Sequence, residues 1–195
     1  MRIRLLTFLV LACSLSFAQS APIDAEHSRI TIHVDKTGLF SFAGDKHEIS
    51  APITSGTIDD KAGTVEFTID ARKLQVLDPQ LDEKKRAEVQ KTMLGPAVLD
   101  SDKYPEITFR STKATAEGSN AWNVTGDLTL HGQTHPVLVS AKKEHGIYAG
   151  SAKLKQTDFG ITPVAVGGGT VKVKDELKLD FQVALRVLKV RQKSR

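Results

Sequence analysis

Alternation of apolar and polar side chains recurs along most of the chain after residue 20, and it constrains the fold more than any other feature. A period of two residues predicts a strand with one buried face, because successive side chains on a strand point to opposite faces. The clear segments are 30–34, 65–71, 107–110, 122–125, 128–130, 137–139, 148–154 and 177–187, with weaker candidates at 39–43 and 49–58.

Turn signals separate these segments at short intervals. Glycine or asparagine occurs in each of 60–63, 117–120, 131–134 and 144–146, as expected for hairpin loops. About eight or nine short antiparallel strands follow from this spacing. A sheet of that size must close into a barrel or split into a sandwich to bury its apolar face, so the sequence predicts a mainly all-β fold.

One segment breaks the pattern. Residues 78–94 show helical spacing, with Pro79 near the first turn and Gly95-Pro96 at the end. We therefore expect one helix of about four turns inserted between strands. No linker or repeat divides the rest, which predicts a single domain over residues 21–188 and a basic tail over 189–195.

The first twenty residues are typical of a secretory signal peptide. Arg2 and Arg4 precede a short apolar run over residues 5–12, which is too short to span a membrane. Small residues then allow cleavage after Ser20 or after Ala18, and we favour Ser20. A lipoprotein signal acylated at Cys13 is the alternative, although the bulky Leu11 before it disfavours that reading.

Cysteine content and charge exclude several classes of protein. The chain has one Cys, which leaves with the signal peptide, so no internal disulfide and no cysteine-rich metal site is expected. A net charge of +4 is too small to indicate a nucleic-acid binder. The basic tail lacks the aromatic residues that nucleic-acid binding favours. It is typical of a solvated terminus, with transient contact to an anionic membrane surface as the alternative.

The inward face of the predicted sheet carries Val, Ile, Leu and Phe almost without interruption. An eight-stranded barrel encloses either packed side chains or one small ligand. Both need an apolar lining, so the alternation alone leaves a filled core and an apolar cavity open and favours the core.

Candidate catalytic groups are weak. His131 and His135 are four residues apart, but they flank a turn and not a helix, so zinc-type spacing does not apply. His27 and Ser28 are neighbours on a strand and point to opposite faces. Asp59-Asp60 and Asp82-Glu83 lie in a turn and at a helix start. The glycines at 167–169 lack the sequence of a phosphate loop. We expect no catalytic residue, no metal site and no cofactor.

Five segments in the right order resemble the YceI-like family of exported lipid-binding proteins. The central one, 126–137, reads GDLTLHGQTHPV and is similar to the family's Gly-Asp-Leu-Thr-Leu-His-Gly signature. The others are 23–28 (Ile-Asp-x-x-His-Ser), 40–44 with 56–58, 104–111 (Tyr-Pro-x-Ile-x-Phe-x-Ser) and 159–161 (Phe-Gly-Ile). Residues 33–38 and 78–93 depart from the family pattern, and the second region is longer and more charged.

The resemblance implies an extended eight-stranded, lipocalin-like barrel in the periplasm, without enzymatic activity. It also implies a ligand, a long-chain polyisoprenoid of the polyprenyl phosphate or quinone type, and shifts the interpretation from core to cavity. The expected lining is Phe40, Phe42, Phe67, Ile69, Phe109, Leu128, Leu130, Phe159, Phe181 and Val183. The alternatives are a filled stress-response or interaction barrel and, less favoured, a metal-assisted hydrolase at His131 and His135.

Overall fold

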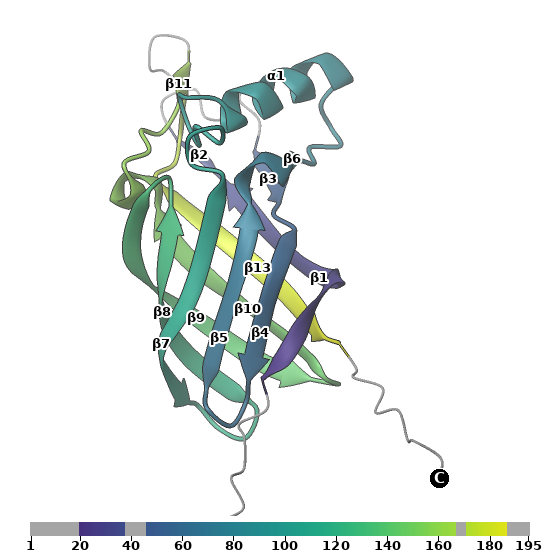
Figure 1. The fold of residues 1–195 in the computed structure, drawn as a ribbon. Helices are drawn as coiled ribbons and strands as arrows, with labels where there is room; N and C mark the ends of the chain where they lie inside the picture. The colour runs from purple at the N-terminus through teal and green to yellow at the C-terminus, as the bar shows by residue number, and fades with distance from the viewer. Residues whose placement is uncertain (1–19, 38–45, 167–170, 187–195) are drawn as a thin grey trace, which may run out of the picture.

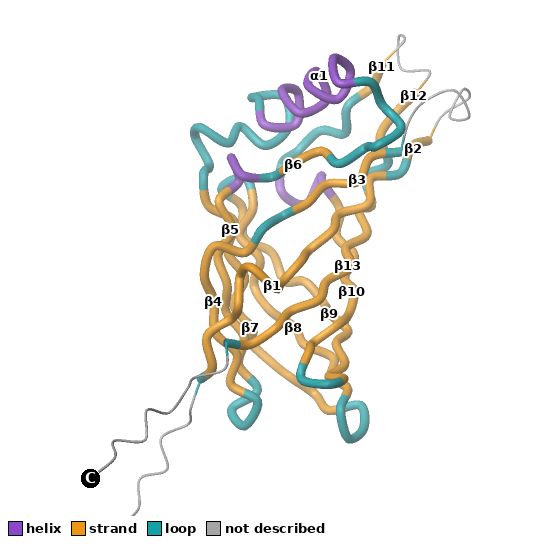
Figure 2. The backbone as a smooth tube through the Cα atoms, turned by 90° about the vertical axis from the view of Figure 1, so that its right-hand side faces the viewer, coloured by secondary structure: helices purple, strands orange, loops and turns teal. Residues whose placement is uncertain are grey.

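The computed structural model describes residues 20–37, 46–166 and 171–186. Strands dominate, and one α-helix lies across one end (Figures 1 and 2). The elements are β1 (Ala21–Val34), β2 (Lys36–Thr37), β3 (His47–Ser50), β4 (Ile53–Asp59), β5 (Thr64–Asp70), η1 (Ala71–Lys73), β6 (Gln75–Val76), α1 (Glu83–Leu94), β7 (Glu106–Ala116), β8 (Ala121–Leu130), β9 (Gln133–Glu144), β10 (Ile147–Lys155), η2 (Gln156–Phe159), β11 (Ala165–Val166), β12 (Val171–Val173) and β13 (Glu176–Leu185).

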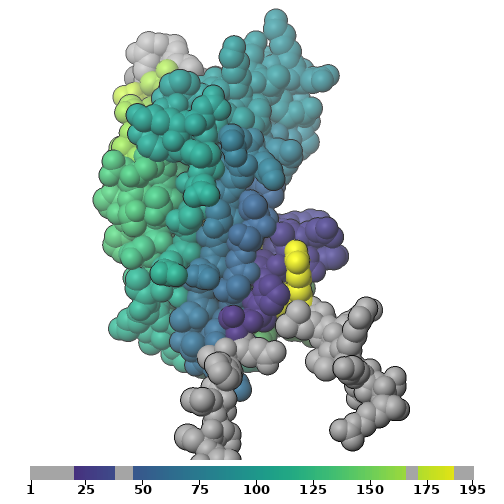
Figure 3. Space-filling model, viewed as in Figure 1, coloured from purple at the N-terminus to yellow at the C-terminus, as the bar shows by residue number. Residues whose placement is uncertain are grey.

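Eight of these strands form a closed antiparallel barrel. Their order around the barrel is β1, β4, β5, β7, β8, β9, β10 and β13, and pairing of β13 with β1 closes the ring. β3 and β6 extend the sheet from β1, while β11, β12 and β2 form a small separate sheet. The mainly all-β fold expected from the alternation and the eight-stranded barrel implied by the family resemblance are therefore confirmed. In the space-filling view its wall of β4, β5 and β7 is continuous, and the helical region extends beyond it (Figure 3).

β1 closes the barrel by changing partners along its length. Ala21 and Pro22 pair with β4, and the register with β13 is interrupted between Asp24 and Arg29. At this bulge the Ser28 hydroxyl donates to the Asp24 carbonyl (2.6 Å) and accepts from the Ala184 N–H (3.1 Å). The His27 ring bonds the Asp24 carboxylate at 2.9 Å and lowers its pKa. The opening motif thus forms the kink that lets one strand pair on both sides.

Two elements differ from expectation in their bounds. The weak candidate at 49–58 is divided between β3 and β4, with Pro52, which has no N–H to donate, at the break. The candidate at 39–43 lies outside the described residues. The helix begins at Glu83, five residues later than expected, and has 12 residues, just over three turns. Asp82 caps it by accepting from the Lys85 N–H (2.9 Å). Asp78 does not cap the helix, since its carboxylate accepts from the Glu48 N–H of β3.

One end of the barrel, which carries the turns at 60–63, 117–120 and 145–146, is packed with side chains. The Tyr148 hydroxyl bonds Asp60, and the Lys143 ammonium lies 2.5 Å from the same carboxylate and 4.7 Å from the Tyr148 ring centre. Trp122 packs beside Tyr148. Burial raises the pKa of Asp60, but hydrogen bonds from Lys143 and Tyr148 outweigh it, so its pKa lies below the usual value. We call this the filled end.

α1 lies across the opposite end, the helix-covered end (Figure 2). In the described residues, no helix is both long enough and apolar enough to cross a lipid bilayer. The chain enters and leaves the barrel at the filled end, where the Arg186 N–H donates to the Pro22 carbonyl.

Close approach of Gly126 to the Phe109 ring predicts a large effect of a small substitution. A β-carbon at Gly126 would lie 2.4 Å from the ring and 2.7 Å from the Arg110 carbonyl oxygen. Gly126→Ala should therefore lower the free energy of unfolding by ~1–3 kcal/mol through overpacking. Asp127→Ala, at the exposed neighbouring position, is the control. Urea denaturation measures both, and equal stability of the two variants would contradict the prediction.

Candidate ligand cavity

A cavity of about 510 Å³ occupies the barrel beneath α1. Six of the eight barrel strands, β1, β5, β7, β8, β10 and β13, contribute to its apolar wall. This wall includes Ile30, Ile32, Val34, Ile49, Ala51, Phe67, Ile69, Ile107, Leu128, Leu130, Leu154, Leu177 and Leu179. Ile32, Phe67, Leu177 and Leu179 point inward yet are only partly buried, because they face the cavity. The inward face is hollow in this half of the barrel.

One face of α1 covers the cavity. Leu81, just before the helix, and Lys85, Val89 and Met93 within it follow at intervals of four residues and all contribute to the lining. Glu88 and Thr92 lie on the same face. Lys85 is also 68% exposed, so the cavity reaches the surface beside the helix. This opening is the mouth of the cavity.

The polar lining residues are, besides Lys85, Glu88 and Thr92 of α1, Lys36, His47, Gln156 and Lys172. Lys36 continues the inward face of β1 two residues beyond Val34, and His47 is the cross-strand partner of Val34 on β3. Asp78, whose side chain is fully buried, lies 2.5 Å from the His47 Nδ1 and accepts from the Glu48 N–H at 2.8 Å. The segment that leads into α1 is thereby attached to β3, and the His47 ring is fixed in orientation at the mouth.

The expected lining residues divide into four groups. Phe67, Ile69, Leu128 and Leu130 line the cavity. Phe109, Phe181 and Val183 point inward but lie below it, in the packed half of the barrel.

Phe159 is 1% exposed and belongs to η2, where its ring packs edge-on against His135 and not at the cavity wall. Phe40 and Phe42 lie outside the described residues. Sequence reasoning missed the mouth residues Lys36, His47 and Asp78. His47 precedes Ile49 by two residues, so on a strand both side chains point to the same face, and this spacing could have indicated His47. Nothing in the sequence linked Asp78 to His47.

His131 and His135, the histidines of the hydrolase alternative, have structural contacts. His131 and Gly132 both have positive φ and form the tight turn between β8 and β9. The His131 Nδ1 lies 3.1 Å from the Phe159 carbonyl oxygen, and its ring packs on Tyr104. Neither histidine lines the cavity. Within residues 20–37, 46–166 and 171–186, no three His, Cys, Asp or Glu side chains gather closely enough to hold a metal ion.

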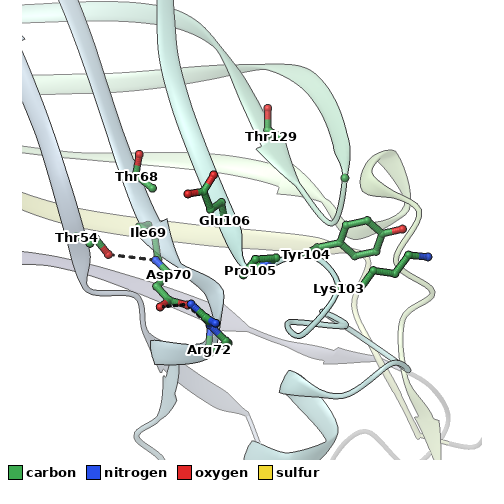
Figure 4. A pocket seen from close by; sticks show the side chains of 11 residues that line it. Thr54, Thr68, Ile69, Asp70, Arg72, Lys103, Tyr104, Pro105, Glu106 and Thr129 are labelled. Atoms are coloured by element: carbon green, nitrogen blue, oxygen red, sulfur yellow. Dashed lines mark hydrogen bonds and ion pairs between the residues drawn. The ribbon is translucent and has the colours of Figure 1, made fainter.

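A second hollow of about 440 Å³ lies on the outer face of β4, β5, β7 and β8 (Figure 4). Two acids, Asp70 and Glu106, and two bases, Arg72 and Lys103, line it, so it has no net charge. The Arg72 guanidinium bonds the Asp70 carboxylate at 2.8 Å, which lowers the pKa of Asp70. The inner cavity is the better candidate for a ligand.

These features define a class: a small closed β-barrel with an apolar internal cavity under a helix. The chain belongs to the YceI-like family, whose domain model matches residues 22–185. A UPF0312 protein of Pseudomonas syringae pv. tomato is 34% identical over 166 residues, covering 76% of this chain and 83% of the relative. A UPF0312 protein of Vibrio cholerae is 28% identical over 163 residues, covering 76% and 82%.

Solved structures share the fold. The crystal structure of Burkholderia cenocepacia BcnA matches with a TM-score of 0.58 at 21% identity, over 85% of this chain and 99% of that protein. The Campylobacter jejuni YCEI protein matches with a TM-score of 0.50 at 17% identity, over 78% and 84%. At these identities the likeness supports the fold alone.

The buried contact between Asp78 and β3 predicts that this side chain holds the segment leading into α1. Asp78→Ala leaves the Glu48 N–H and the His47 ring without their acceptor, which should cost ~1–3 kcal/mol of stability. Amide exchange should accelerate most in residues 77–94. Asp102→Ala, at an exposed position, is the control. Unchanged exchange in α1 would show that the contact does not hold the helix in place.

Proposed function

We propose that this protein is an exported carrier that holds the apolar chain of an isoprenoid lipid in the cavity. The observation that carries the proposal is the 510 Å³ apolar space inside a barrel of the YceI-like family. Burial of hydrocarbon contributes ~0.8 kcal/mol per methylene group, so such a space binds a flexible chain without specific polar contacts. The role is binding for transport, storage or stress protection, and no reaction is assigned.

The mouth offers a place for a polar head group. Lys36, His47, Lys85 and Lys172 contribute basic groups to the lining and Glu88 a single acid. A head group at the mouth would remain near water while the chain lies below it. This arrangement accommodates a phosphate or a quinone ring, and a partner membrane, approached transiently, would be the source of the lipid.

A substitution that fills the cavity separates a binding role from a core role. Leu179→Trp places a bulky indole ring in the empty space, so the affinity for lipid should fall at least about tenfold, ~1.4 kcal/mol. The stability of the barrel should be kept or raised, because the ring fills a cavity. Leu138→Trp, at a position 58% exposed on the outer face, is the control. Lipid extraction and native mass spectrometry of protein from its own host measure the occupancy. Wild-type protein that never carries lipid would overturn the proposal.

Export to the periplasm is the second part of the proposal. β1 begins at Ala21, directly after the preferred cleavage position, so either cut leaves the barrel intact. The periplasmic fraction should contain a protein that starts at Ala21 or at Gln19, as N-terminal sequencing would show. Cys13→Ser should leave its release from the membrane unchanged. Membrane-bound protein that this variant sets free would support the lipoprotein alternative instead.

A further inference from the structure

We propose that three phenylalanines, Phe67, Phe109 and Phe181, form a floor across the barrel that limits the ligand to a chain of about 20 carbon atoms. The inference rests on the proposed function and specifies its ligand. A cavity of ~150 Å³ holds benzene, which has six carbons, so by proportion the 510 Å³ space holds ~20 carbons, or about four isoprene units.

The lining stops at one level around the barrel. On β5 it reaches Phe67, and on β7 it stops at Ile107, one inward position above Phe109. Phe67 and Phe109 are direct cross-strand partners. On β13 the lining ends at Leu179, directly above Phe181. On β5, β7 and β13, which lie on two sides of the barrel, the empty space therefore ends at the same level.

The rings of the floor are held in place. Phe67 and Phe109 stack with centroids 5.4 Å apart and planes 22° from parallel. The Phe109 ring lies over Gly126, where a β-carbon would be only 2.4 Å from it. The Phe181 ring lies over Gly150 in the same way, at 2.6 Å. Because the Phe109 and Phe181 rings pack directly on backbone that lacks a side chain, and the Phe67 ring stacks on Phe109, a ligand has little space into which it could push them.

The half of the barrel below the floor is packed. Val124, Val137, Tyr148 and Val183 are all buried there and belong to the continuous core. The contacts of Tyr148 with Asp60 and Trp122 close the filled end. A chain that reaches the floor therefore has no continuation, and any further carbon must remain at the mouth beside α1, where burial adds little.

Affinity should consequently rise with chain length only up to the floor. Prenyl alcohols of three, four, six and eight isoprene units are suitable probes, with binding measured by native mass spectrometry on the mature protein. We expect affinity to increase at least ~10-fold from three to four units and then to stay constant within ~2-fold. Continued increase from four to eight units would overturn the floor, whereas failure of every alcohol to bind would overturn the proposed function itself.

Variants at and above the floor test whether these residues set the length limit. Phe109→Ala should make six units bind more tightly than four, because loss of the whole ring leaves a cavity below. Phe159→Ala removes an equally buried ring away from the cavity and should leave the length profile unchanged. Ile69→Trp, which adds bulk above the floor, should move the plateau down to three units even if Phe109→Ala does not fold. An unchanged profile in Ile69→Trp would contradict the proposal.

Discussion

Closure of the barrel through β1 is the interaction on which the rest of the structure depends. β1 pairs with β4 at its start, with β13 along most of its length and with β3 at its end, and the kink at Ser28 permits all three. A sheet that did not close would leave two edges unpaired and no interior. The cavity, the floor and the position of α1 all follow from this one strand.

Sequence periodicity predicted an all-β fold and which residues point inward, because strand geometry fixes that alternation. The choice of a barrel over a sandwich came from the family resemblance. It could not predict where the interior is empty. Leu179 and Phe181 belong to the same alternating face, yet one lines the cavity and the other lies below it. The difference arises from rings that pack on glycines of neighbouring strands, and such cross-strand contacts are invisible to a local pattern. α1 starts later than expected for the same reason. The Asp78 carboxylate accepts from the Glu48 N–H of β3, and a local pattern does not show this contact.

The family motifs mainly build the fold and contribute little to the cavity. Ser28 forms the kink of β1, and Gly132 receives the Tyr104 ring, whose nearest carbon would lie 2.6 Å from a β-carbon there. Phe159 joins η2 to the hairpin through His131 and His135. Of the signature stretch, only Leu128 and Leu130 reach the cavity wall. Of the three floor rings, Phe109 belongs to a motif, whereas Phe67, Phe181 and the cavity-facing residues of α1 lie outside the motifs.

The first described strand begins and the last one ends at the filled end, where Arg186 contacts Pro22, while the mouth lies at the opposite end. This polarity has a practical consequence for handling the molecule. A fusion partner, an affinity tag or a solid support joined at Ala21 or Arg186 would stand on the far side of the barrel from the mouth. Immobilised protein would thus keep its entrance oriented toward the solution, which suits it to surface-based measurements of lipid capture.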